Sequence, residues 1–215
     1  MNRKFLVTRP NHDVTTRYLC MWAKKLVDFA KNKNFDVLDL EREKANKEEV
    51  EGRLKKIAPR LVMLNGHGNV DRITGHDDKT LIKCGQNEKI LEYKIVYAVS
   101  CKSAVILGIE AINSGCLSYI GYKENFIFCH KNKIRKPLED KTAELFLEPS
   151  NQIIISLLKG NASGESCINS KKYSMRNIKK LLNSESSPET NQLVQFLYWN
   201  LKHQVCLGDE NAKIE

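Results

Sequence analysis

The sequence predicts an α/β fold with a mostly parallel sheet of five to six strands and helices on both faces. Two observations support this prediction. In the first half of the chain, short apolar runs alternate with longer amphipathic segments. Their order of strand, helix, strand, helix, strand requires crossover connections, which favour parallel pairing with helices over the sheet.

The first five elements follow from the spacing of apolar residues. Residues 4–8 (KFLVT) predict a buried strand, and residues 13–33 predict a helix with Asp13 as its N-cap. The apolar face of this helix recurs at steps of three or four residues: Val14, Tyr18, Trp22, Leu26 and Phe29. The next segments predict a strand, a helix and a strand in that order, at residues 35–40, 46–58 and 60–65.

The remaining segments complete the sheet and add helices. The sequence predicts a hairpin at residues 71–84 and a fourth strand at 94–100. A helix follows at 103–115, ending at Gly115, and a fifth strand at 116–122. Beyond about residue 137 we expect a mainly helical part, with helices at 141–158, 173–182 and 189–203 and turns at 160–170 and 183–188. The run IIISLL at 153–158 also fits a strand.

Length and hydropathy limit the class of protein. A chain of 215 residues suits one domain, spanning 1–215, with a well-buried core. It has no uninterrupted apolar run near the roughly 18 residues of a membrane span, and its N-terminal apolar run is too short for a signal peptide. We therefore expect a cytoplasmic protein without a membrane partner.

Cysteine spacing and charge limit its ligands. The seven cysteines form no C-x-x-C pair and are an odd number, so we expect mostly reduced thiols and no metal site. The net charge of +9 would suit a nucleic-acid binder, but the lysines lie beside acids, as in EREKANKEEVEGRLKK. A mixed, solvated helix surface explains this pattern better than a direct nucleic-acid partner, and a basic patch facing an acidic partner is the alternative.

Two reactive side chains follow neighbouring strands in the sequence. His67 ends the third strand in NGHGN, and Cys101 ends the fourth in AVSCKSA, 34 residues later (101 − 67). Ligands of open α/β sheets bind at the carboxyl ends of strands, where both residues would lie if the strands are adjacent. An imidazole beside a thiol can activate it as a nucleophile and then protonate a leaving amine.

The flanking residues refine this hypothesis. Cys101 precedes a predicted helix, whose N-terminus would favour the thiolate. Gly68 has no side chain, so its backbone N–H, with that of Cys101, could form an oxyanion hole. The simpler alternatives are a glycine turn around His67 and a packing role for Cys101. A dinucleotide-binding loop is excluded because Asp71 occupies the place of the third glycine.

These blocks resemble the caspase-like cysteine peptidases of clan CD, closest to the gingipain-like and CHAT-type branch. The strand-NGHGN and strand-SCKSA motifs carry the resemblance, which spans roughly residues 3–128. It implies a caspase-haemoglobinase three-layer sandwich, His67 as general acid/base, Cys101 as nucleophile, Gly68 as oxyanion donor, a thioester acyl-enzyme and no organic cofactor. The AVSC sequence lacks the Gln-Ala-Cys signature of caspases, so a preference for aspartate does not carry over.

Substrate contacts are expected from the loop TRPNHDVTTR at residues 8–17, because this loop often builds the specificity pocket in the clan. Asp13 in such a pocket would favour a basic side chain and Arg17 an acidic one; the simpler explanations are an N-cap and a solvated charge. Ca²⁺ binding by Asp71, Asp77 and Asp78 is a further alternative to simple hairpin solvation.

The function expected from these features is a cysteine endopeptidase that cleaves a specific protein partner. A role in regulated bacterial defence or signalling follows by analogy alone. The alternatives are a catalytically inactive caspase-like module that binds a regulatory protein partner and, third, a nucleic-acid-binding protein.

Overall fold

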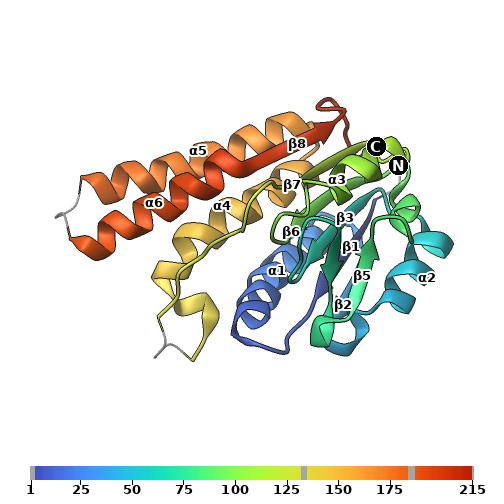
Figure 1. Cartoon of the computed structure of the whole chain (residues 1–215), viewed down its shortest axis with the longest axis horizontal. Helices are drawn as coiled ribbons and strands as arrows, with labels where there is room; N and C mark the ends of the chain where they lie inside the picture. Colours follow the sequence, from blue (N-terminus) through green and yellow to red (C-terminus); the bar gives the residue numbers. More distant parts are fainter. Residues whose placement is uncertain (1–2, 132–134, 184–186, 215) are drawn as a thin grey trace.

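A six-stranded sheet with the strand order β2-β1-β3-β6-β7-β8 forms the centre of the molecule (Figure 1). The computed structural model describes residues 3–131, 135–183 and 187–214. The first five strands in this order are parallel, and β8 pairs antiparallel with β7. The bounds are β1 Lys4–Arg9, β2 Asp36–Glu41, β3 Leu61–Asn65, β6 Ile95–Val99, β7 Ser118–Tyr122 and β8 Gln204–Gly208. The predicted mostly parallel α/β sheet is therefore confirmed.

Helices cover both faces of this sheet (Figure 1). One face packs against three helices, α1 (Val14–Asn32), α4 (Lys141–Leu158) and α5 (Ser163–Leu182). The other packs against α2 (Lys47–Ile57), α3 (Leu107–Asn113) and the hairpin of β4 (Arg72–Thr74) and β5 (Thr80–Lys83). The last helix, α6 (Pro188–His203), packs on α4 and α5 through Phe146, Ile178 and Leu197. Short 3₁₀ turns occupy Arg42–Lys44, His76–Asp78, Glu88–Leu91 and Pro137–Glu139.

Burial on both faces explains why the central strands are apolar throughout. In β1, Phe5 and Val7 face the α1 side, whereas Leu6 faces the α2 side. Successive side chains of a strand point to opposite faces, so a strand covered on both sides needs no polar alternation. The continuous apolar runs that predicted β1, β3 and β6 are thus a consequence of the three layers.

Two helices begin well away from their predicted first residues. The helix expected at residue 103 begins at Leu107, because the N–H of Ala104 bonds to the carbonyl of Tyr122 and that of Leu107 to the carbonyl of Val70. The helix expected at 173 begins at Ser163, inside the predicted turn. Small residues suit this first turn, since a Cβ on Gly164 would lie 2.9 Å from Glu210. Residues 153–158 are helical, so the strand alternative for IIISLL is wrong.

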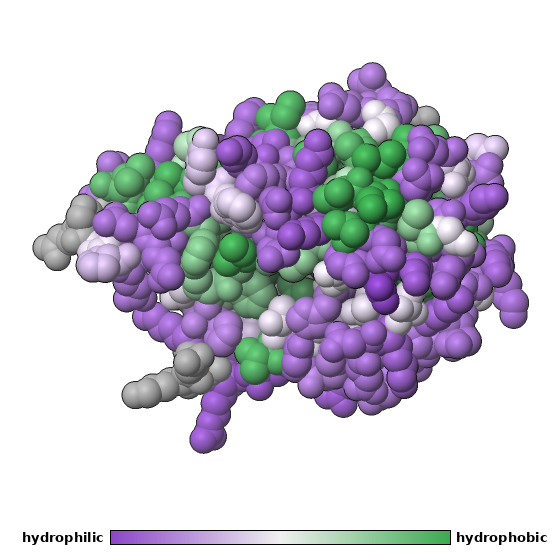
Figure 2. Space-filling view, in the orientation of Figure 1, coloured by the Kyte–Doolittle hydropathy of each residue, from purple (hydrophilic) through white to green (hydrophobic). Residues whose placement is uncertain are grey.

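The surface is largely hydrophilic in the view of Figure 2, with an apolar patch over α3. Ile106 and Ile109 are exposed in this region. Within the described ranges, no helix combines the length and apolar character needed to cross a membrane.

The carboxyl ends of β1 and β3 are joined by hydrogen bonds between Thr8 and Asn65, both fully buried. The Thr8 hydroxyl accepts from the Asn65 N–H at 2.9 Å and donates to the Asn65 carbonyl at 3.2 Å. The Asn65 side-chain amide donates to the Thr8 carbonyl at 2.7 Å. These bonds fix where the two following loops leave the sheet.

We expect the isosteric change Thr8→Val to lower the free energy of unfolding by about 1–3 kcal/mol, because it leaves the buried N–H of Asn65 without its partner. Thr8→Ser keeps the hydroxyl and loses one methyl group, at a cost of about 1 kcal/mol. Urea unfolding of the two variants measures the difference. A serine variant less stable than the valine variant would contradict this account.

Candidate functional site

The pairing of β3 with β6 brings His67 and Cys101 to the same edge of the sheet. The strands are paired with a constant offset of 34 residues, from Leu61 with Ile95 to Asn65 with Val99. His67 and Cys101 each lie two residues beyond the last pair, so they leave neighbouring strands at the same level. The Ser100 hydroxyl donates to the His67 carbonyl at 3.0 Å and ties the two segments together.

Gly68 lies where only a glycine fits. A Cβ at this position would lie 2.1 Å from the Ser100 Oγ and 2.7 Å from the Arg72 carbonyl oxygen. Gly68 and Ile73 form an isolated antiparallel bridge. The hydrogen bonds of this bridge come from the adjacent residues: the Asn69 N–H donates to the Arg72 carbonyl at 3.1 Å, and the Thr74 N–H donates to the His67 carbonyl at 2.8 Å. This bridge does not use the Gly68 N–H.

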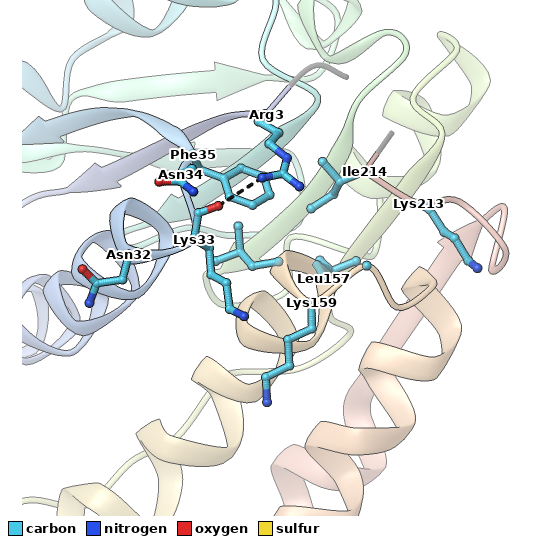
Figure 3. A pocket seen from close by; sticks show the side chains of 11 residues that line it. Arg3, Asn32, Lys33, Asn34, Phe35, Leu157, Lys159, Lys213 and Ile214 are labelled. Atoms are coloured by element: carbon cyan, nitrogen blue, oxygen red, sulfur yellow. Dashed lines mark hydrogen bonds between the residues drawn. The ribbon is translucent and has the colours of Figure 1, made fainter.

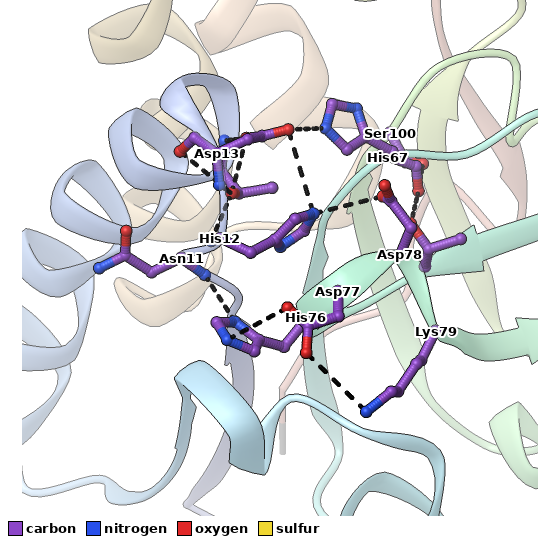
Figure 4. Close-up of polar contacts among 11 residues, drawn as sticks. Asn11, His12, Asp13, His67, His76, Asp77, Asp78, Lys79 and Ser100 are labelled. Atoms are coloured by element: carbon purple, nitrogen blue, oxygen red, sulfur yellow. Dashed lines mark hydrogen bonds and ion pairs between the residues drawn. The ribbon is translucent and has the colours of Figure 1, made fainter.

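Asp13 contacts the imidazole of His67. Its Oδ2 lies 2.6 Å from His67 Nε2, while its Oδ1 accepts from the Thr16 N–H at 2.7 Å and caps α1, as predicted (Figure 4). Partial burial acts to raise the pKa of Asp13, but hydrogen bonds from Thr16 and His67 outweigh it and lower the pKa to about 2. The carboxylate is thus ionised and oriented toward His67.

Cys101 is a half-buried free thiol. Burial raises its pKa, and the nearby Lys102 offsets only part of the effect. The predicted stabilisation by a helix N-terminus is wrong, because α3 begins six residues later, at Leu107. The Cys101 Sγ faces the Phe126 carbonyl at 3.9 Å, and no hydrogen bond joins His67 to Cys101 among the described residues. The thiol form therefore predominates in the unliganded protein.

His12, which was not predicted as a site residue, lies at the same edge. His12 Nε2 lies 3.3 Å from Asp78 Oδ1 and 4.0 Å from Asp13 Oδ2 (Figure 4). The His12 ring packs edge-on against the rings of His67 and His76, with centroids 6.0 and 5.4 Å apart. His12 follows β1, a neighbour of β3, so knowledge of the strand order would have placed it here.

His76 links the β4–β5 hairpin to the loop after β1, which carries His12 and Asp13. Its Nδ1 accepts from the Asn11 N–H at 3.2 Å, which joins the hairpin to the loop after β1. Asp77 and Asp78 have left-handed backbone conformations, with φ of 53° and 56°, which aspartate tolerates better than most residues. This turn places Asp78 beside His12.

The aspartates considered for Ca²⁺ contact different partners. Asp71 accepts from Arg72 at 3.1 Å, Asp77 lies 3.7 Å from His76, and Asp78 contacts His12. Among the described residues, the group able to hold a metal ion is instead His12, His67 and Asp78.

Arg17 lies apart from the His67 contact. It lines a cavity of about 400 Å³ together with Asn11, Met21 and residues 135–139. Its Nε is buried and lacks a hydrogen-bond partner within the described ranges. His67 and Gly68 line a second cavity of about 520 Å³ with Asn69, Arg72, Thr74 and Asp78.

A larger cavity, of about 940 Å³, lies at the opposite edge of the sheet (Figure 3). Arg3 and Phe35, near the amino ends of β1 and β2, line it together with Lys33, Lys159 and Lys213. It is positively charged and holds none of the predicted site residues.

No protein-family model matches the chain, and no curated protein matches its sequence. Its function is therefore inferred from the geometry of the residues at this edge.

We expect alkylation of Cys101 by iodoacetamide to follow a pH curve shifted upward from that of an ordinary thiol. Burial raises the pKa in the folded chain, so the thiolate forms only at higher pH. Mass spectrometry of the Cys101 peptide measures the rate, with the urea-unfolded chain as control. A folded-state midpoint at or below the unfolded one would overturn the burial argument.

Proposed function

We propose that this protein is a cysteine endopeptidase with a caspase-like fold, in which Cys101 is the nucleophile and His67 the general acid/base. The β3–β6 register supports this most directly, because it delivers both residues to one edge at the same level. The carboxylate of Asp13 contacts His67 and would orient this base, as the third group beside the nucleophile and the base.

The contacts suggest a division of roles within the series. With a proton on Nε2 held by Asp13, the His67 ring keeps a lone pair on Nδ1. Nδ1 accepts the thiol proton as the Cys101 sulfur attacks the peptide carbonyl. The Gly68 N–H donates a hydrogen bond to the resulting oxyanion. Collapse breaks the C–N bond, His67 returns the proton to the amine, and water then hydrolyses the thioester with His67 as base.

The raised pKa of Cys101 fits a nucleophile that is activated only when substrate binds. In the unliganded protein the thiol stays neutral. A substrate that excludes water from this edge strengthens the electrostatic coupling between thiol and imidazole. Such a site reacts slowly with stray electrophiles, as suits cleavage of one specific protein partner.

The side chain recognised by the protein is proposed to be acidic. Asp13 is engaged by His67 and Thr16, so it does not present a free carboxylate to a basic substrate. The cavity beside the same loop contains Arg17 and Arg135, whereas Lys136 is paired with Glu139 at 2.9 Å. Arg17 lines this cavity, and its guanidinium is the proposed donor to a substrate carboxylate.

One observation favours an inactive interaction module as the second candidate. The Cys101 sulfur faces the Phe126 carbonyl rather than His67. If this arrangement persisted with a partner bound, the fold would bind a regulatory protein without cleaving it.

We expect Cys101→Ala to abolish cleavage of a peptide library and His67→Ala to reduce it by about 10²–10⁴-fold, the usual contribution of a general base. Asp13→Asn, which still caps the helix, removes the charge beside His67 and should lower kcat with little change in KM. Cys84→Ala, at a cysteine outside this edge, serves as the matched control. Cleavage that persists in both dyad variants would exclude the mechanism.

A second experiment addresses substrate choice. We expect library profiling to show a preference for Asp or Glu before the cleaved bond, and Arg17→Gln to reduce kcat/KM for these peptides by about 10- to 100-fold, the value of a charge-assisted hydrogen bond. Lys24→Gln on the same helix removes an equal charge and should change nothing. A preference for basic residues would instead assign the pocket to Asp13.

A further inference from the structure

Four donor groups converge beside the dyad, at the ends of β1, β3 and the hairpin. They are the imidazoles of His12 and His67 and the carboxylates of Asp13 and Asp78 (Figure 4). Donor atoms of His12, His67 and Asp78 all lie within 4.8 Å of one another. Asp13 Oδ2 lies 2.6 Å from His67 Nε2 and 4.0 Å from His12 Nε2.

We propose that His12, Asp13, His67 and Asp78 form a zinc site that switches off the His67–Cys101 dyad. The inhibitory part of this inference rests on the proposed peptidase function, whereas metal binding by the four residues does not. The site is assigned from the geometry and chemistry of its donors.

Three of the six separations among the donors are close to those of tetrahedral zinc. Bonds of about 2.0–2.1 Å place neighbouring ligands roughly 3.3 Å apart. The His12–Asp78 separation is 3.3 Å, and the separations of 2.6 and 4.0 Å around Asp13 lie on either side of this value. Asp78, the most exposed of the four side chains, and the half-exposed imidazole of His67 can adjust toward this spacing by small rotations.

Charge and ligand type favour Zn²⁺ over harder cations. Two carboxylates and two neutral imidazoles balance a divalent ion. The ion pairs of Asp13 and Asp78 within the described ranges are with histidine rather than with Lys or Arg. Imidazole is a good ligand for zinc, whereas Ca²⁺ and Mg²⁺ prefer oxygen donors.

The surroundings of His12 determine how tightly we expect zinc to bind. Its Nδ1 is buried without a hydrogen-bond partner within the described residues, whereas metal-bound histidines usually donate their second N–H to an acceptor. Asp78 is exposed, so a metal can enter from solvent. We therefore expect a reversible site, weaker than a closed structural one.

Inhibition follows from the tautomer of His67. Zinc on Nε2 displaces the proton that Asp13 holds there, and the neutral ring then carries its proton on Nδ1. Nδ1 has no lone pair left to accept the thiol proton of Cys101. Metal and catalysis thus compete for the electron pairs of one imidazole.

Metal binding is tested on the Cys101→Ala protein, so that neither activity nor the Cys101 thiolate contributes. Calorimetric titration with ZnCl₂ should show one ion per chain, and His12→Ala and Asp78→Ala should each raise Kd at least about tenfold. Asp77→Ala, at the adjacent exposed aspartate, is the matched control and should bind normally. Co²⁺ should give a tetrahedral spectrum without a thiolate charge-transfer band. Equal binding by all variants, or none, overturns the site.

Inhibition is then tested on the protein with Cys101 intact, each variant being compared with its own metal-free rate. Zinc should suppress cleavage, EDTA should restore it, and Asp78→Ala should need at least about tenfold more zinc than Asp77→Ala. Activity that requires zinc and is lost with EDTA overturns the inhibitory role. Absence of cleavage under every condition, with zinc binding intact in the titration, refutes the peptidase proposal and the inhibitory role and leaves the metal site standing.

Discussion

The parallel pairing of β3 with β6 is the constraint on which the rest of this edge depends. Its offset of 34 residues equals the separation of His67 from Cys101, so the two leave the sheet at one level. A slip of one residue would turn one side chain to the opposite face. The Thr8–Asn65 bonds set β1 beside β3 in the same way and bring the loop carrying Asp13 to the same edge.

The sequence allowed the core of the sheet to be predicted because its strands are buried on both faces. The apolar runs of β1, β3 and β6 need no tertiary information to be recognised. Asp13 could likewise be predicted as an N-cap from the residues around it. Its contact with His67 could not, because a β-α-β-α-β pattern fits several strand orders and the contact exists only when β1 is next to β3.

The environment of Cys101 shows the opposite case, in which local pattern and tertiary structure disagree. Residues 103–106 have helical character in sequence, yet the N–H groups of Ala104 and Leu107 bond to carbonyls of Tyr122 and Val70. These long-range bonds delay α3 to Leu107 and deprive the thiol of a helix N-terminus. Burial then decides the protonation state of Cys101, and it favours the neutral thiol.

Asp13 links the fold to both proposed chemistries at this edge. One of its oxygens caps α1, so the position of the carboxylate is fixed by the helix rather than by the site. Its other oxygen meets Nε2 of His67 and, in the proposed mechanism, determines which ring nitrogen is left to act as a base. The same fixed carboxylate lies between two imidazoles, which is also the arrangement a zinc ion needs. The proposed orientation of the base and the proposed attraction of a metal therefore have a single structural cause, so both proposals require that mutation of Asp13 weaken the two together.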